Sequence, residues 1–379
     1  MDHQAALEAA FGKPKAVTSE SIHWNLTQAM AGFLDPQQMF HLLEFQANHV
    51  SPAIFKVEAL KQKQLEIVKQ TNMNELEWSI ERQLRNLPED TAMPQENQEK
   101  KDQTWRKLET LEAKFEEVTE KLMNEEAQEQ IDSGRDSRML WDILKTRFKF
   151  EDEDLETLFS YGKAQYDDGD YEKCNQALGI YCALAPQDHA KHFDAIWGQL
   201  SAAIMLQQTS EEESWDKALE HLNTIKETID KSNFADPLKL LNWRSWLLHW
   251  SLFCYFNKST KMTGKGGNKK TKDIIDLFLN QEEYRNAIET ICPWLLRYLA
   301  VVIVTGRNVE KKHKTLMHLI RLIDQEKYNY SDPIIDFLFC LENKFDFEAA
   351  QIKLQQSVQV LKSDYSEVRK TVKMTIFFY

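Results

Sequence analysis

Glycine and proline are scarce in this sequence, with 11 glycines and 9 prolines among 379 residues. Proteins built from many short strands need both residues in their turns, so this scarcity argues against an all-β fold and favours helices. Hydrophobic residues make up 42% of the chain, which is enough for a substantial core. The length exceeds that of one ordinary domain. The composition therefore predicts an all-α protein made of two packed units or of an extended repeat array.

Cysteine is also sparse, and its spacing gives no sign of a disulfide framework or a zinc site. The five cysteines are widely separated and form no C-x-x-C pair: Cys174, Cys182, Cys254, Cys292 and Cys340. Each falls in an apolar stretch with helical character. We expect them to be small core residues in a reducing compartment.

Long apolar runs are missing as well. The N-terminus has an early acid and no apolar stretch, so it resembles neither a secretory signal nor an anchor. The most membrane-like segment, residues 294–304, is interrupted by Arg297 and is shorter than the roughly 20 residues that a spanning helix needs. We therefore expect no membrane contact, a core role for this segment within one helix over residues 282–305, and a cytoplasmic protein with at most a minor nuclear pool.

The sequence carries no recognisable catalytic motif. It contains neither G-x-S-x-G nor H-E-x-x-H, and no pair of carboxylates in an apolar setting. We expect no enzymatic activity, no catalytic, cofactor-binding or metal-ligating residues, no cofactor and no small-molecule substrate.

Positive charge is in the minority, since the formal net charge is −13. Such a chain repels a phosphate backbone except at local basic patches, which excludes nucleic acid as the main partner. Two basic segments stand out, residues 258–272 and a cluster made of Arg307 and residues 311–314. The first lacks the glycine of a phosphate-binding loop, because Lys269 precedes Lys270-Thr271, and no strand precedes it. Both read as solvated surface, with a weak contact to ribosomal or messenger RNA as the second option.

Helical periodicity dominates what is present. We expect a flexible tail over residues 1–20, a helix from residue 21, and a second helix that Asp35 caps and Pro36 opens. Residues 88–98 read as a loop. A heptad-like seam then indicates a helix lying on a neighbour, which Ser133-Gly134 ends. Its apolar positions are Leu108, Leu111, Phe115, Val118 and Leu122. These helices make up an N-terminal region over residues 21–150.

A repeated helix pair follows over residues 151–242. Residues 155–186 fit the tetratricopeptide pattern, in which a close-packing glycine, a turn glycine, an aromatic, a small residue and a terminal proline recur. These are Gly162, Gly169, Tyr171, Cys174 and Pro186. The motif recurs at Trp197-Gly198 with Trp215 and Ala218, and again at residues 345–350. This pattern predicts a right-handed superhelical stack of tetratricopeptide-like helix pairs.

Residues 243–257, W-R-S-W-L-L-H-W-S-L-F-C-Y-F-N, are apolar on nearly every side of a helix. Such a helix is normally buried among others, so we expect it to be the central rod of a helical core. His249 lies among its tryptophans with no Cys or His at metal-ligand spacing, which predicts a core histidine rather than a ligand.

Several of these stretches resemble a known family. Residues 246–257, residues 274–279 (I-I-D-L-F-L) and residues 284–299 (Y-R-N-A-I-E-T-I-C-P-W-L-L-R-Y-L) are similar to the E subunit of eukaryotic translation initiation factor 3. Shorter matches occur at residues 42–45, 71–73, 135–140 and 345–351, and all run in family order from about residue 24 to residue 361.

The resemblance implies a PCI protein, in which tetratricopeptide-like helices lead into a winged-helix module. Its PCI region would cover residues 243–379, truncated before the winged helix, because Y-S-E-V-R-K-T-V-K-M-T-I-F-F-Y stands after residue 364. The family implies a non-catalytic scaffold that helps to assemble initiation factor 3 on the small ribosomal subunit. Its partners would be the other subunits of the factor and the small ribosomal subunit within the preinitiation complex.

Two other functions fit the same residues. One is a PCI scaffold subunit of the proteasome lid or the COP9 signalosome. The other is an RNA-binding helical-repeat module that uses the two basic segments.

Overall fold

The computed structural model describes residues 24–49, 56–132, 137–209, 215–232, 236–256, 271–306 and 312–363. Every regular element in these ranges is a helix, which confirms the all-α prediction and the helical-repeat fold. The chain divides into two compact units. Unit 1 combines residues 1–60 with residues 226–379, and unit 2 covers residues 61–225.

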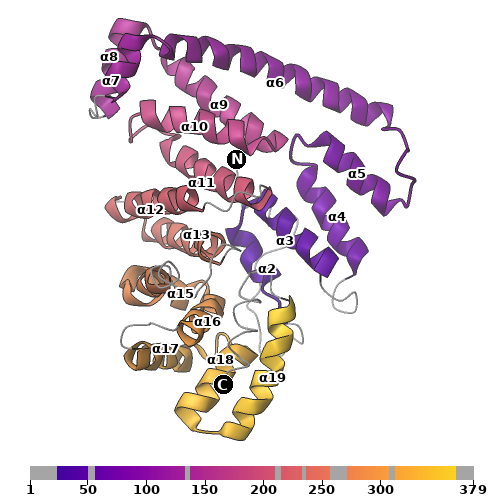
Figure 1. The fold of residues 1–379 in the computed structure, drawn as a ribbon, viewed down its shortest axis with the longest axis vertical. Helices are drawn as coiled ribbons and strands as arrows, with labels where there is room; N and C mark the ends of the chain where they lie inside the picture. The colour runs from indigo at the N-terminus through magenta and orange to yellow at the C-terminus, as the bar shows by residue number, and fades with distance from the viewer. Residues whose placement is uncertain are drawn as a thin grey trace. The chain divides into compact units, whose positions relative to one another are not determined.

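Unit 2 contains seven complete helices of the described residues (Figure 1). They are α5 (Asn74–Leu84), α6 (Gln95–Leu122), α7 (Glu125–Asp132), α8 (Ser137–Phe148), α9 (Asp152–Asp168), α10 (Tyr171–Leu184) and α11 (His192–Thr209). Two helices span the boundary between the units, α4 (Val57–Val68) and α12 (Asp216–Lys231).

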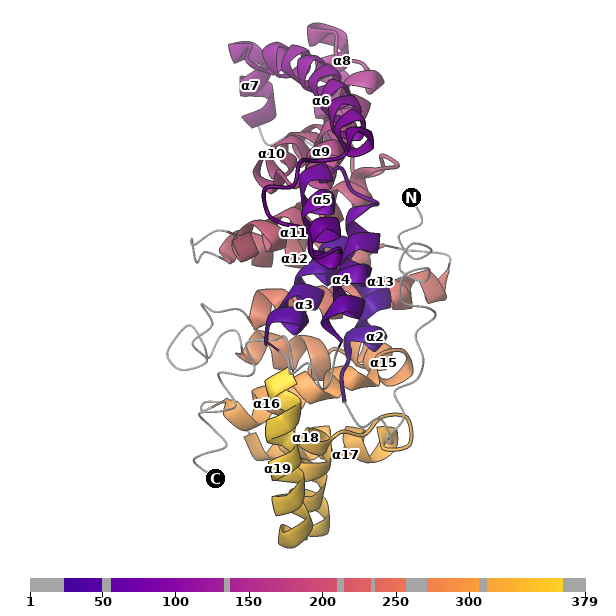
Figure 2. The same ribbon diagram turned by 90° about the vertical axis from the view of Figure 1, so that its right-hand side faces the viewer.

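Unit 1 joins the N-terminal helices to the second half of the chain. Its elements are α2 (Thr27–Met30), η1 (Ala31–Phe33), α3 (Pro36–His49), α13 (Pro237–Tyr255), η2 (Asp276–Asn280), α15 (Glu282–Thr290), η3 (Pro293–Leu295), α16 (Leu296–Thr305), α17 (Lys312–Glu326), α18 (Pro333–Phe339), η4 (Cys340–Lys344) and α19 (Phe347–Ser363). Residues 271–275 are also helical. Within this unit α18 and α19 run side by side (Figures 1 and 2).

A local start signal predicted the beginning of α3 correctly. Asp35 accepts the Gln37 backbone N–H at 2.9 Å, and Pro36 opens α3. The helix expected from residue 21 is shorter than predicted, because residues 24–26 are not helical and α2 begins at Thr27. Residues 21–23 lie outside the described ranges.

The seam helix was predicted with the right face but the wrong ends. Helix α6 begins at Gln95, inside the predicted loop, and ends at Leu122 rather than at Ser133. Asn124 interrupts it, since its side chain caps α7 by accepting the Glu126 N–H at 3.0 Å. Phe115 of the seam stacks on Tyr161 of α9 with ring centroids 4.2 Å apart. The seam therefore packs on a neighbouring helix, as predicted.

Residues 282–305 were predicted as one helix and are two. Ile291 and Cys292 separate α15 from the η3–α16 stretch, which Pro293 opens, and the two parts bend by 114°. Proline has no N–H to continue the helix and is favoured at the first position of a new one. The bend places residues 294–303 in the interior of unit 1, in agreement with the predicted core role.

The tetratricopeptide-like repeat is present in unit 2, where α9, α10 and α11 pack in sequence (Figure 1). Gly169 ends α9 with a left-handed φ of 92°, and Asp170 caps α10 by accepting the Lys173 N–H at 3.0 Å. Leu178 of α10 lies between two glycines. A Cβ on Gly162 would meet its side chain at 2.9 Å, and a Cβ on Gly198 would meet it at 2.7 Å.

These distances make Gly198→Ala a test of the repeat packing. Leu178 is buried and is held on its other side by Gly162, so it has no room to retreat. We expect the substitution to lower the free energy of unfolding by about 1–3 kcal/mol, measured by urea denaturation.

The matched control is Gly179→Ala on α10, where the nearest atom would be 3.5 Å from the new Cβ. It should raise stability by about 0.5–1 kcal/mol, because alanine favours the helix interior. Equal effects of the two substitutions would contradict the proposed close approach.

Candidate interaction surfaces and the core that positions them

Arg297 and Asp332 form an ion pair in the interior of unit 1. The Arg297 Nε lies 2.8 Å from the Asp332 Oδ2, and the two side chains are 3% and 0% exposed. The other polar atoms of the pair are also engaged. Arg297 Nη2 donates to the Trp24 carbonyl oxygen at 2.7 Å, and the Tyr330 hydroxyl donates to Asp332. Such added hydrogen bonds are what offset the desolvation of a buried pair.

Asp332 has a second role as the cap of α18. Its Oδ1 accepts the backbone N–H groups of Ile334 at 2.8 Å and Ile335 at 3.0 Å. Burial raises the pKa of Tyr330, which keeps its hydroxyl protonated as a donor. The Asp332 carboxylate therefore orients α18 and binds Arg297 of α16. Arg297 in turn holds the chain at Trp24.

His249 of α13 is the second polar group of this core. Its Nε2 accepts from the Trp294 indole N–H at 3.0 Å. Because the indole nitrogen only donates, the Nδ1 of His249 carries the proton and donates to the Ser245 carbonyl oxygen at 2.6 Å. The Phe33 ring stacks on the imidazole with centroids 4.5 Å apart and planes at 7°.

Burial without an ionic partner lowers the pKa of His249 to about 4. The imidazole is therefore neutral in the folded protein, as expected for a core histidine. Next to it, the Trp250 indole N–H donates to the Phe33 carbonyl oxygen at 2.9 Å. The aromatic helix thus holds the N-terminal segment through one stacked ring and one hydrogen bond.

The predicted burial of residues 243–257 is confirmed for most of α13. Ser245, Leu247, Leu248 and all residues from His249 to Leu252 are buried, while Trp243 and Trp246 are half-buried. The helix begins earlier than the aromatic run, at Pro237, and Asp236 caps it by accepting the Leu238 N–H at 3.0 Å.

Three exposed apolar side chains lie at the turn into α19 and in the first half of that helix. Phe345, Phe347 and Ile352 are 70%, 68% and 58% exposed, and we call them the α19 patch. The turn has the helix-turn motif that was predicted to recur at residues 345–350. Phe345 has a φ of 54° where Gly169 has 92°, and Asp346 caps α19 by accepting the Ala349 N–H at 3.0 Å.

The burial of side chains differs between the two copies of the motif at one position. Phe347 stands where Tyr171 stands in α10, yet Tyr171 is only 9% exposed. In unit 2, α10 packs against both α9 and α11. Helix α19 packs mainly against α18, and none of the described residues covers Phe347 in the same way.

The two basic segments have different outcomes. Residues 257–270 lie outside the described ranges, as do Arg307 and Lys311. Lys312 was predicted to be surface charge, and that prediction was wrong in part, because its Nζ donates to the carbonyl oxygens of Val304 at 3.1 Å and Gly306 at 3.3 Å. It thereby caps the end of α16. His313 and Lys314 are exposed, as predicted.

The cysteines occupy the predicted core positions. Cys174, Cys254, Cys292 and Cys340 are buried, Cys182 is half-buried, and all five are free thiols. Burial raises the pKa of Cys174 and of Cys182 to about 12. In the described ranges, no three His, Cys, Asp or Glu side chains gather where they could hold a metal ion.

None of the helices in the described part of the chain is by itself long and apolar enough to cross a bilayer. The bent pair of α15 with η3–α16 meets the length and composition criteria only when its two parts are joined. Residues 294–303 of this pair are buried within unit 1.

Known proteins match nearly the whole chain. A sequence model described as "eIF3 subunit 6 N terminal domain" matches residues 25–165. The E subunit of eukaryotic translation initiation factor 3 from Caenorhabditis elegans is 32% identical over 364 residues, covering 93% of this chain and 78% of the relative. The chain belongs to this family of E subunits.

Other members of the family match to the same degree. The Arabidopsis thaliana protein is 32% identical over 342 residues, covering 90% of this chain and 71% of its own. The Aspergillus terreus protein is 33% identical over 363 residues, covering 94% and 75%. These matches do not favour a subunit of the proteasome lid or the signalosome. The resemblance predicted from the aromatic segments is confirmed.

Sequence reasoning missed the Arg297–Asp332 pair, although it noticed Arg297 as a break in an apolar run. The signal was a lone arginine inside a core segment, which implies a buried partner. The identity of that partner was not predictable from spacing, since Asp332 and Trp24 are far away in the sequence.

The buried neutral His249 predicts a dependence of stability on pH. The unfolded histidine titrates near pH 6.5 and the folded one near 4, so the unfolded chain binds more protons between these values. Stability contributed by the neutral imidazole is complete above pH 6.5 and is lost as the pH falls toward 4. We expect His249 to account for a loss of about 2 kcal/mol between pH 7.5 and pH 5, measured by urea unfolding.

The control is His249→Gln, which keeps a polar side chain but does not titrate. Its own loss over the same pH interval should be smaller by about 2 kcal/mol. The same loss in both proteins would show that His249 is not the group responsible.

Proposed function

We propose that this chain is a non-catalytic scaffold subunit of eukaryotic translation initiation factor 3, which helps to assemble the factor on the small ribosomal subunit. The observation that carries the proposal is the match of at least 90% of the chain to relatives named as the E subunit of this factor. A stack of helices suits this role, because its outer faces can contact other proteins.

The finer assignments rest on the same support. We propose that residues 243–379 act as the PCI helical region and residues 151–242 as the tetratricopeptide-like region. The relatives' names, as subunits of a translation factor, favour a cytoplasmic location. Contact with the small ribosomal subunit is part of the proposal.

We further propose that the α19 patch receives a helix from another subunit of the factor. The support is the internal repeat. In unit 2 the equivalent aromatic, Tyr171, is buried with its ring centroid 5.6 Å from that of Tyr166 on α9, and α10 also packs on α11, whereas Phe347 is 68% exposed. An incoming helix packed on α19 would complete the same layer. Exposed aromatics are the residues that most often dominate binding energy at protein interfaces.

A pull-down from eukaryotic cell extract tests the scaffold proposal and, with variants, the proposal for the α19 patch. The tagged full chain should recover other initiation factor 3 subunits and small ribosomal subunit proteins, identified by mass spectrometry. Recovery of neither would overturn the scaffold proposal, and recovery of proteasome lid or signalosome components would favour that alternative.

The patch is tested with the double variant Phe345→Asn and Phe347→Ser, in which asparagine tolerates the positive φ at position 345. We expect at least about tenfold lower recovery of the subunits, since losing a central aromatic anchor costs about 2 kcal/mol or more. The control changes the exposed Met123 and Leu238, 72% and 74% exposed, to serine and should leave recovery unchanged.

Thermal unfolding distinguishes aromatics that bind another subunit from aromatics that stabilise this chain. The patch variant should keep the wild-type melting temperature within a few degrees, because both side chains face solvent. A large drop in melting temperature with unchanged recovery would contradict the proposal, because it would place the patch inside the folded chain.

A further inference from the structure

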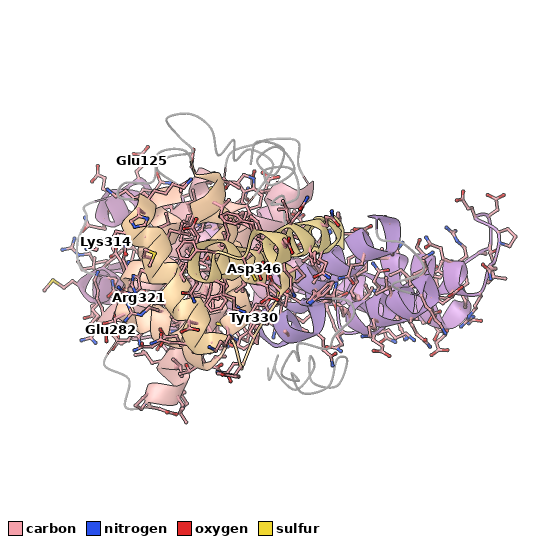
Figure 3. All side chains as sticks on the ribbon, turned by 90° about the horizontal axis from the view of Figure 1, so that it is seen from below. Glu125, Glu282, Lys314, Arg321, Tyr330 and Asp346 are labelled. Carbon is pink, nitrogen blue, oxygen red and sulfur yellow. The ribbon has the colours of Figure 1, made fainter. Side chains whose placement is uncertain are left out.

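Helix α17 carries a stripe of basic side chains that the scaffold role does not use. Lys314, His318 and Arg321 are spaced by four and three residues, which places them on one face of the helix. Tyr328 follows in the turn after α17 and is 88% exposed. We call these four residues the α17 stripe. Figure 3 shows Lys314 and Arg321 along the outer side of this helix.

The positive charge of the stripe is not neutralised by its own helix. Asp324 forms an ion pair with Lys327, with 2.9 Å between Nζ and Oδ1. Glu326 is buried and accepts from the Asn329 side-chain amide at 2.9 Å. No carboxylate of the described residues lies within ion-pair distance of Lys314 or Arg321.

The neighbouring helix adds a further cation. Burial is the main cause that lowers the pKa of His318. The positive charges of Arg285 on α15, Arg321 and Lys314 lower it further. Glu289 partly offsets Arg285, since its Oε1 is 3.4 Å from the Arg285 Nε. Lys314, Arg321 and Arg285 thus bring three cations to the surroundings of His318 on a chain whose net charge is −13.

The composition of the face distinguishes between anionic partners. The exposed positions of α17 are His313, Lys314, Arg321, Asp324 and Gln325, and none of them is apolar. The apolar side chains of α17 that reach this surface, Leu316 and Met317, are partly buried, so a docking protein helix would find no fully exposed apolar anchor on α17. A phosphate backbone needs cations rather than apolar anchors, and an exposed aromatic beside them gives a base a ring on which to stack.

We infer that the α17 stripe binds single-stranded RNA, with Lys314 and Arg321 on successive phosphates and Tyr328 stacking on a base. This activity goes beyond the scaffold role and does not depend on it. It also differs from an RNA contact through residues 258–272, because its residues belong to a folded helix and the turn that follows it.

The test measures binding of a fluorescein-labelled 20-nucleotide oligouridylate to the purified full chain by fluorescence anisotropy, from 50 to 300 mM salt. The wild type should bind, and Lys314→Gln with Arg321→Gln should weaken binding. The slope of log K against log salt should fall by about 1.4, because each lost single-strand phosphate contact removes about 0.7. Tyr328→Ala should weaken binding by about 5- to 150-fold without changing this slope.

The matched control is Lys107→Gln with Lys114→Gln on α6. These lysines are also exposed and seven residues apart, but they lie in a helix rich in glutamate. The control should bind as the wild type does. Circular dichroism of each variant should show unchanged helix content, because all the substituted side chains lie on the surface.

Three results would overturn the inference. The first is that the wild type does not bind the oligouridylate at 50 mM salt. The second is that the stripe variant binds with the wild-type slope while serine substitution of the lysines in residues 258–272 abolishes binding. The third is displacement of the RNA by an equal concentration of a 20-residue polyglutamate peptide, with no effect of Tyr328→Ala. That result would assign the stripe to an acidic peptide.

Discussion

The buried ion pair between Arg297 and Asp332 is the constraint on which unit 1 depends. A charged pair removed from water stabilises a fold only when its remaining donors and acceptors are also satisfied. Here that requirement brings together Trp24, α16 and the start of α18. The N-terminal helices therefore belong to the same compact unit as the second half of the chain, and the first described residue is tied to a helix 273 positions later.

The aromatic helix α13 also buries polar groups that need hydrogen-bond partners, but these groups are neutral. It buries two serines and a histidine among tryptophans, and each described polar partner lies within the same unit. His249 is bound by Ser245 and Trp294, and Trp250 binds the backbone of Phe33. These polar groups are buried and hydrogen-bonded inside unit 1. The chain's contacts with other molecules would then fall to its outer surfaces, where the α19 patch is apolar and the α17 stripe is basic.

Features encoded within a few residues were predictable from the sequence, and features that depend on distant partners were not. The Asp35-Pro36 helix start, the close-packing Gly162 and the turn at Gly169 each have a local physical cause, and all were predicted. The proline signal at Pro293 was present but was outweighed by the apolar run around it. The exposure of Phe347 could not be predicted from its motif, because burial of the equivalent Tyr171 depends on neighbouring helices. The partners of Arg297 lie 35 and 273 residues away, beyond any local pattern.

The most direct test of this account is amide hydrogen exchange of the full chain, comparing the wild type with Arg297→Lys. Lysine keeps the charge beside Asp332 but lacks the planar fork that also reaches the Trp24 carbonyl oxygen. We expect exchange in residues 24–34 to accelerate at least about tenfold, which corresponds to a local loss of about 1.4 kcal/mol, while α9 and α10 of unit 2 stay protected. Unchanged protection of residues 24–34 would contradict the central claim that Arg297 holds the N-terminal segment in unit 1.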